Sequence, residues 1–227
     1  MGAEPRTAPS GRILTGVAWA VLVMGLWLWG REITELPGGS AGAAGALFGA
    51  GLPAPHPPLE GAALPARVDV PSIGVQAPVV ARGLDRDGAI DPPPYDRPGA
   101  VGWYGSGTRP GAAGAALFVG HVDTASKPAV FYGLSSAKQG DTVRVLRDDG
   151  LIAQFTIEDV QVYERERFEA AKVYGPRVAG RAELRLITCG GTYDRVAKEY
   201  TANVVVSAYL TGVSRAPGAS RAPARPV

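Results

Sequence analysis

The sequence predicts a mainly β fold, a closed barrel or a sandwich, in which many short strands are joined with few helices. Apolar and polar residues alternate with the two-residue period of a strand in several short stretches of the chain. Glycine and proline, with 31 and 20 residues among 227, fall mostly between and outside these stretches. The triplet Asp148-Asp149-Gly150 separates two of the stretches and is a strong hairpin signal.

The composition excludes several classes of function. The formal net charge is only +2 and the body has no cluster of lysine and arginine, so nucleic acid is not expected as the main partner. The single cysteine excludes an intrachain disulfide and a metal site built from cysteines. Only two histidines accompany it, so we expect neither a metal ion nor another cofactor.

The N-terminal part predicts a membrane anchor. Residues 1–12 are polar and are assigned to the cytoplasm, whereas Ile13–Trp29 contains no charged residue. This run is near the lower limit of about 17–25 residues for a spanning helix, and Trp27 and Trp29 lie at its outer end. A cleaved signal peptide is the alternative, but its apolar core is usually about 7–15 residues long. We therefore expect residues 13–30 to anchor the protein in the cell membrane by a single pass, with its body extracellular.

The segments on either side of the body lack an apolar period. Residues 31–65 are rich in Gly, Ala and Pro and are predicted to be a linker, in which His56 is exposed to solvent. Residues 213–227 are rich in Arg, Ala, Pro and Ser and are predicted to be a disordered tail. One domain remains between them, residues 66–212, and it shows no internal repeat.

Within this domain, strands are expected where short apolar or alternating runs end at turn residues. The predicted strands cover residues 67–70, 75–81, 115–120, 142–147, 151–163, 184–189 and 202–210. Residues 82–114 contain many Gly, Pro and Asp and are expected to form a long connection with turns. Short helical segments are expected over residues 130–137 and 168–173.

The stretch LRLITCGG at residues 184–191 contains Cys189, the only cysteine of the chain. Its residues alternate between two faces, as in a strand. Two glycines follow the cysteine, so we expect the strand to end there and the backbone to open near the sulfur. A lone thiol in this position suits a nucleophile, and it suits a small buried residue equally well.

His121 ends the apolar run LFVGH and is followed by VDT. A histidine at the end of a strand, just before a loop, is in a usual position for a general acid or base. The alternative is a histidine that only hydrogen-bonds a loop. Gly120 is expected to let another backbone approach closely. With Cys189 at another strand end, His121 suggests a pair of nucleophile and base.

Four motifs resemble the sortases, the cysteine transpeptidases of Gram-positive cell envelopes, over roughly Leu64 to Leu210. They are PARVDVPSIGVQAPV at 65–79, VGWY at 101–104, FVGHVD at 118–123 and LITCGGTYDR at 186–195. The class that they resemble is common in high-GC actinobacteria and is called class F. Arg185 stands where the family signature TLxTC has its first threonine, a departure that is typical of this class.

The resemblance implies a closed eight-stranded barrel with short helices and a site made of histidine, cysteine and arginine. His121 and Cys189 carry over directly. For the arginine, alignment of the last strand places Asn203 at the family's position, so Arg195, in the loop after the nucleophile, is the nearest candidate. Arg185 is the runner-up, but four residues along a strand correspond to roughly 13 Å.

A sortase would cleave an LPxTG-like sorting signal through a thioacyl-enzyme and transfer the protein to an amine acceptor of the cell wall, such as a peptidoglycan precursor. His121 would act first as acid and then as base, and Arg195 would stabilise the oxyanion or hold the peptide backbone. An L,D-transpeptidase is a rival enzyme, but Ile187 and Thr188 occupy the place of its histidine and glycine before the cysteine. A noncatalytic, membrane-anchored barrel that binds a partner is the rival from another class.

Overall fold

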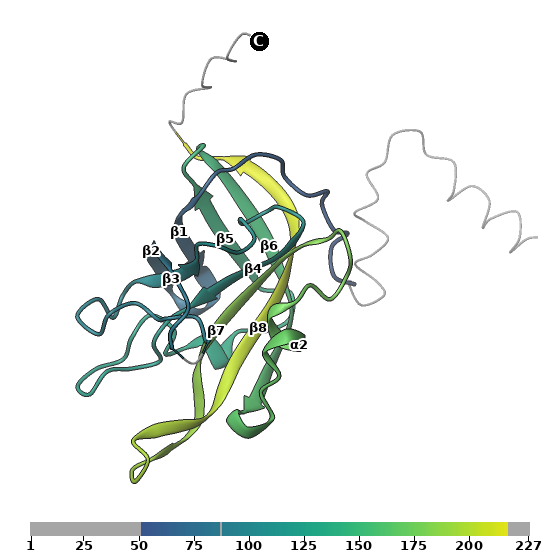
Figure 1. The fold of residues 1–227 in the computed structure, drawn as a ribbon. Helices are drawn as coiled ribbons and strands as arrows, with labels where there is room; N and C mark the ends of the chain where they lie inside the picture. The colour runs from purple at the N-terminus through teal and green to yellow at the C-terminus, as the bar shows by residue number, and fades with distance from the viewer. Residues whose placement is uncertain (1–50, 87, 218–227) are drawn as a thin grey trace, which may run out of the picture. The chain divides into compact units, whose positions relative to one another are not determined.

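The computed structural model describes residues 51–86 and 88–217 of the 227-residue chain. Within these residues, eight strands close into a barrel in the order β1-β2-β3-β4-β7-β8-β6-β5 (Figure 1). The prediction of a mainly β protein with a closed eight-stranded barrel is confirmed. The strands are β1 Pro65–Val70, β2 Val75–Arg82, β3 Val101–Tyr104, β4 Gly114–Val119, β5 Thr142–Arg147, β6 Leu151–Glu164, β7 Ala182–Asp194 and β8 Glu199–Arg215.

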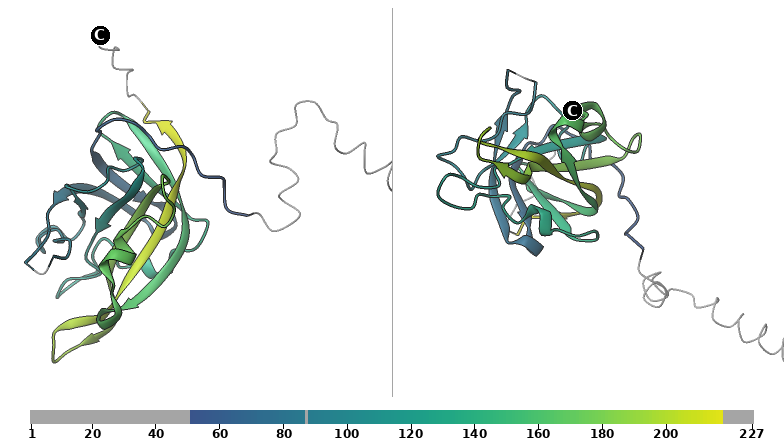
Figure 2. Two further views of the ribbon diagram at one scale, coloured as in Figure 1. Left: turned by 45° about the vertical axis from the view of Figure 1, so that its right-hand side comes forward. Right: turned by 90° about the horizontal axis from the view of Figure 1, so that it is seen from below.

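Two neighbouring pairs in the barrel are parallel, β2 with β3 and β4 with β7, and the other pairs are antiparallel. The β4–β7 pair matters most for function, because parallel strands end at the same edge of a sheet. The helix α2, Ala170–Tyr174, belongs to the segment that joins β6 to β7 and lies beside β7 and β8 (Figures 1 and 2).

The wall formed by β4 and β7 is buried on both of its faces. Phe118 and Leu186 are fully buried in the barrel interior. The opposite face carries Leu117 and Ile187, which form a second apolar cluster with Val173 of α2. Burial on both faces explains why β4 is a continuous apolar run rather than an alternating one.

The hairpin of β7 and β8 extends further than the sequence predicted. The expectation that β7 ends at the two glycines after Cys189 is wrong, because pairing resumes beyond them with Tyr193 opposite Tyr200. The register shifts between Gly190 and Tyr193, and Gly191 has a φ of +77° that favours glycine. The glycines therefore make a bulge inside a long hairpin, which projects beyond the body of the barrel (Figures 1 and 2).

Several predicted boundaries also differ from the structure. The long connection expected over 82–114 contains β3, which has only four residues and is too short to show a period. The helix expected over 130–137 is reduced to a 3₁₀ turn at Leu134–Ser136 (η2), whereas the one expected over 168–173 appears as α2.

Within the linker predicted over residues 31–65, the part around His56 and Leu59 packs on the barrel. The backbone N–H of His56 donates to the carbonyl of Leu210 at 2.8 Å, and that of Leu59 donates to the carbonyl of Gly111 at 2.7 Å. The side chain of Leu59 also packs against the barrel core. Single side chains and backbone groups therefore fix this part of the predicted linker to the barrel, although it has no apolar period, and the side chain of His56 stays half-exposed.

The predicted anchor at residues 13–30 and the polar residues 1–12 lie outside the described residues, as do residues 31–50 of the predicted linker and 218–227 of the predicted tail. The start of the tail predicted over 213–227 is wrong, because β8 continues to Arg215. Of the helices that the structure does describe, none is both long enough and apolar enough to cross a membrane.

Candidate active site

The parallel pairing of β4 and β7 brings His121 and Cys189 together. The two strands run in a constant offset of 68 positions, so that Val119 lies opposite Ile187. The offset continues past the paired residues, because Thr188 Oγ1 donates a hydrogen bond of 2.7 Å to the carbonyl of Gly120. The next positions at this offset are His121, two residues past the end of β4, and Cys189 on β7. Paired strands lie about 4.8 Å apart.

Gly120 fixes the backbone immediately before His121. A Cβ atom at this position would lie 2.6 Å from Cδ2 of Phe131 and 2.7 Å from Cγ1 of Val130. The backbone N–H of Phe131 also donates to the carbonyl of His121 at 3.0 Å. The expected close approach at Gly120 is thus made mainly by side chains of the following loop, and it holds that loop against the histidine.

The imidazole of His121 is buried and has two partners in the segment between β2 and β3. Nε2 lies 2.7 Å from the carbonyl oxygen of Pro93, and the ring stacks on Tyr95 with centroids 4.2 Å apart. A carbonyl oxygen only accepts hydrogen bonds, so Nε2 carries a proton in both the neutral and the cationic ring. Nδ1 is therefore the nitrogen that is left to gain and lose a proton.

Cys189 lies at the junction of two hollows. A cavity of about 400 Å³ is lined by both His121 and Cys189, and a wider hollow of about 1070 Å³ also includes Cys189. Burial raises the pKa of the Cys189 thiol above its ordinary value; the charge of Arg165 acts in the opposite direction, and the charges of Asp123 and Glu199 act with burial. Cys189 is nevertheless exposed, so a substrate can reach its sulfur.

A second contact joins the loop after His121 to the strand next to Cys189. The hydroxyl of Tyr200, on β8, donates a hydrogen bond to the carboxylate of Asp123. This hydrogen bond raises the pKa of Tyr200 to about 12. The pair therefore ties the histidine loop to the β7–β8 hairpin beside the thiol. Neither residue is marked as functional by the sequence, although Asp123 is the last residue of the motif FVGHVD.

Arg195 lies away from the thiol in this structure. It belongs to the turn at the tip of the β7–β8 hairpin, is exposed and lines neither of the two hollows at Cys189. The prediction that Arg195 reaches the thiol assumed that a loop begins directly after Cys189. Because β7 continues to Asp194, Arg195 is separated from Cys189 by about 20 Å of extended strand. The same distance argument that disfavoured Arg185 therefore applies more strongly to Arg195.

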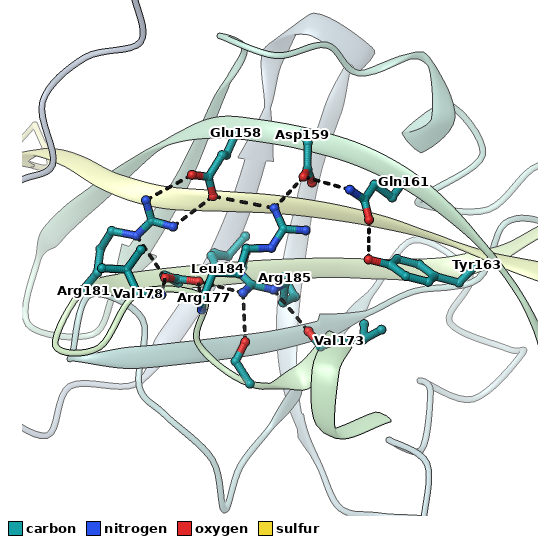
Figure 3. Close-up of polar contacts among 12 residues, drawn as sticks. Glu158, Asp159, Gln161, Tyr163, Val173, Arg177, Val178, Arg181, Leu184 and Arg185 are labelled. Carbon is teal, nitrogen blue, oxygen red and sulfur yellow. Dashed lines mark hydrogen bonds and ion pairs between the residues drawn. The ribbon is translucent and has the colours of Figure 1, made fainter. Parts of the chain in front are cut away.

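The runner-up, Arg185, is fully buried and occupied by other partners (Figure 3). Its Nε donates to the carbonyl of Val173 at 3.2 Å, and its Nη2 donates to the carbonyl of Gly175 at 2.9 Å and to the carboxylate of Glu183 at 2.7 Å. These bonds fix the end of α2 against β7. Arg185 thus positions the segment between β6 and β7, which supplies Tyr174 to the cavity at His121.

Glu183 is the anion at the centre of the same network. It is fully buried and also accepts hydrogen bonds from the backbone N–H groups of Arg177 and Val178, at 3.0 and 2.9 Å. Burial acts to raise the pKa of Glu183, but these backbone bonds and the guanidinium groups of Arg185 and Arg181 outweigh it and lower the pKa. Glu183 therefore stays ionised, as a buried carboxylate with this many donors should.

The positive charge that acts to lower the pKa of the Cys189 thiol is that of Arg165, which sequence reasoning missed. Arg165 begins the 3₁₀ turn Arg165–Arg167 (η3) directly after β6 and lines both hollows together with Cys189. No motif marks it, because its proximity to the thiol depends on how β6, β8 and β7 are aligned. Across residues 51–86 and 88–217, no group of three or more His, Cys, Asp or Glu side chains is placed to hold a metal ion.

Comparison with known proteins adds a family match to this geometry. A family model described as the sortase domain matches residues 68–211. Among solved structures, sortase A from Listeria monocytogenes is 16% identical, with a TM-score of 0.51 over 69% of this chain and 93% of that one. Sortase C-1 from Actinomyces oris is 21% identical, with a TM-score of 0.49 over 64% of this chain and 73% of that one. No curated protein matches the sequence.

Proposed function

This chain belongs to the sortase family, and from that premise we propose that it is a cysteine transpeptidase acting on an LPxTG-like sorting signal. The observation that carries the proposal is the register of β4 and β7, which places His121 and Cys189 at the same edge of the barrel. The exposed thiol and the cavity that it shares with the histidine give a peptide access to both groups.

In the first half of the proposed reaction, the thiolate of Cys189 attacks the carbonyl carbon of the threonine in the sorting signal. The carbon–nitrogen bond to the next residue breaks and a thioester forms on the sulfur. The leaving amine takes a proton from Nδ1 of His121, which enters this step as an imidazolium.

In the second half, an amine acceptor of the cell wall, such as a peptidoglycan precursor, attacks the thioester. Nδ1 of His121 takes the proton from this amine, and the thiolate of Cys189 leaves. Nε2 keeps its proton throughout, because it donates to the carbonyl of Pro93. Stacking on Tyr95 keeps the ring plane constant while the charge of the ring changes.

The reaction starts from the thiolate of Cys189, but the surroundings of the thiol disfavour this charged form. Burial and neighbouring carboxylates raise the pKa of the Cys189 thiol, so at neutral pH the thiolate is a minority form. The reactivity of the free thiol should therefore keep rising as the pH increases through and beyond the ordinary range of a cysteine. The charge of Arg165 counteracts part of this effect.

We extend the proposal to the cellular setting on the sequence alone. The uncharged run Ile13–Trp29 supports a single-pass anchor with the barrel outside the cell, and the motifs FVGHVD and LITCGG support the actinobacterial class F. Both features agree with an enzyme that attaches exported proteins to the cell wall.

One assay tests the proposal directly. The full chain in detergent is incubated with a panel of LPxTG-like peptides and an amine, and mass spectrometry follows the thioacyl-enzyme and the transfer product. We expect an acyl group on Cys189 and a transfer product, both absent from Cys189→Ser. If the wild-type protein forms neither species with any peptide and its thiol labels at the same slow rate in His121→Ala, the noncatalytic barrel is the better description.

A further inference from the structure

We propose that Arg165 is the arginine of this site, a catalytic residue that binds the carbonyl oxygen undergoing attack at Cys189, and that Glu199 competes with the substrate for it. The inference rests on the proposed function, in which Cys189 is the nucleophile. It replaces the assignment of this role to Arg195.

The alignment of three strands places Arg165 close to the thiol. Cys189 on β7 lies opposite Asn203 on β8, and Asn203 lies opposite Tyr163 on β6. Two strand spacings separate Cys189 from Tyr163, which is about 10 Å, and Arg165 follows two residues later. Its backbone is therefore about as far from Cys189 as that of Arg185. What distinguishes Arg165 is that it lines both hollows that contain Cys189, whereas Arg185 lines neither.

The position otherwise expected for an arginine is occupied by an uncharged residue. Asn203 stands at the family's arginine position when the last strand is aligned, and it lies directly opposite Cys189. The cavity at His121 includes both Asn203 and Arg165, and Arg165 is the only arginine among the residues that line either hollow at the thiol. The guanidinium group therefore comes from the neighbouring strand end rather than from β8.

The present partner of Arg165 is of a kind that a substrate can displace. Nη1 of Arg165 donates to the carboxylate of Glu199, and the two side chains are 52% and 50% exposed. An ion pair with this exposure is screened by water and contributes little to stability. The guanidinium has five donors in a planar fork, so it can turn part of that fork toward a peptide carbonyl.

The electrostatics of the thiol agree with this placement. Arg165 is the positive charge that acts to lower the pKa of Cys189, and Glu199 acts to raise it. Binding of a substrate carbonyl to Arg165 in place of Glu199 would leave donors aimed at the oxygen where negative charge develops. Glu199 at the start of β8 would then hold Arg165 over the thiol between turnovers.

The same turn supplies a matched control. Arg167 also belongs to η3 and forms an ion pair with Glu164 at 3.3 Å, but its side chain is 82% exposed and it lines neither hollow. Removal of Arg167 takes away the same charge from the same turn. A difference between the two variants therefore reports position and not net charge.

The test compares Arg165→Ala, Arg165→Lys, Arg167→Ala, Arg195→Ala and Glu199→Gln in the full chain. Transfer is measured with the best peptide from the panel, with kcat and KM determined separately. We expect Arg165→Ala to lower kcat by a factor on the order of 10²–10³, as for loss of a main oxyanion donor. Arg165→Lys should recover little, because ammonium lacks the planar fork. Arg167→Ala and Arg195→Ala should stay within about twofold of the wild-type rate.

A second readout needs no peptide. Because Cys189 is the only cysteine, its alkylation by iodoacetamide reports one thiol over a range of pH. The alkylation profile should move to higher pH in Arg165→Ala and to lower pH in Glu199→Gln, and Arg167→Ala should leave it in place.

The two readouts separate failure of the inference from failure of the proposed function. If the wild-type protein transfers peptide and Arg165→Ala does so equally well, or if Arg195→Ala alone loses kcat, the inference is overturned and the proposed function stands. If no peptide is transferred by the wild-type protein, the proposed function fails and the catalytic role of Arg165 fails with it, whatever the alkylation profile shows.

Discussion

Charged side chains are buried near the start of β7 and exposed to solvent near Cys189. Near the beginning of β7, Glu183 and Arg185 are fully buried, and each is held by several partners. Figure 3 shows the contacts of Arg185. Beyond the middle of β7, Cys189 is exposed beside Arg165 and Glu199, whose ion pair is half-exposed. Buried, fully paired charges fix a backbone, because any change leaves a charge unpaired. Exposed, singly paired charges can change partners, as a reaction requires. The comparison predicts that substitutions at the two ends will separate stability from activity.

The largest effect on activity is expected at the exposed end. Either Cys189→Ala or His121→Ala should abolish measurable transfer, while the unfolding midpoint changes little for Cys189→Ala because its side chain is exposed. The double variant should be little worse than either single variant, because the two groups act in one step. Transfer rates and denaturant unfolding of all three variants measure this. Strictly additive losses of rate would contradict a shared step, and substantial transfer by Cys189→Ala would remove the nucleophile assignment.

The largest effect on stability is expected at the buried end. Arg185→Ala leaves the carboxylate of Glu183 without one of its charged partners inside the protein. Removal of one partner of a buried ion pair costs about 3–5 kcal/mol of the free energy of unfolding. Arg167→Ala breaks an exposed pair and should cost less than about 1 kcal/mol. Urea unfolding compares the two variants.

The kinetic consequence of Arg185→Ala sharpens the same comparison. Because Arg185 fixes Val173 and Gly175, its loss should loosen the segment that carries Tyr174 to the cavity. At a temperature where the variant is folded, KM should rise more than kcat falls. A loss of kcat alone, with unchanged KM and stability, would show that Arg185 takes part in the chemistry after all.

A smaller effect on both stability and activity is expected at Gly120, directly after the end of β4, where β4 pairs with β7. Gly120→Ala places a methyl group 2.6 Å from the ring of Phe131, so that the loop after His121 must move. Overpacking of this kind costs about 1–3 kcal/mol, and transfer should fall with it because the histidine is displaced. Gly133→Ala is the matched control, since its nearest neighbour would be 3.6 Å away. Thermal unfolding and kcat measure both variants, and equal behaviour of the two would contradict the packing argument.

A change of pH tests the buried end without a change in its side chains. The pKa of Glu183 is lower in the folded protein than in the unfolded chain, so the folded state binds fewer protons in acid. The stabilisation is complete above the unfolded value, near pH 4.3, and is lost as the pH falls through the lower folded pKa. Urea midpoints measured from pH 7 downward should fall less steeply in Glu183→Gln than in the wild-type protein. Glu164→Gln, at an exposed site, should leave the slope unchanged.

What the sequence predicts well about this site is local. The run LFVGH and the alternation around Cys189 indicate two strand ends with chemically useful residues, and the barrel pairs those strands directly. The proposed arginine, Arg165, could not be found in this way. Its choice depends on whether the two glycines end β7 or form a bulge, and on which residue of β6 is aligned with Cys189 across β8. Both depend on the register between strands that are far apart in sequence, and the two-residue period within one strand does not determine that register.

The smallest effect is expected for the hydrogen bond between Tyr200 on β8 and Asp123 in the loop after His121. Tyr200→Phe removes the hydroxyl that donates to Asp123 and leaves the ring, including its edge contact with Tyr193 at 5.2 Å between centroids. Because the contact is partly exposed, the free energy of unfolding should change by no more than about 1 kcal/mol. The carboxylate of Asp123 stays charged and loses a donor, and the loop that follows His121 loses one of its ties to β8. We therefore expect kcat to fall by severalfold with KM nearly constant.

Tyr193→Phe removes a hydroxyl from the other ring of the same pair and should behave as the wild-type protein. If both variants match the wild type in kcat, the Asp123–Tyr200 contact does not position the histidine, and the backbone bond from Phe131 to His121 is sufficient.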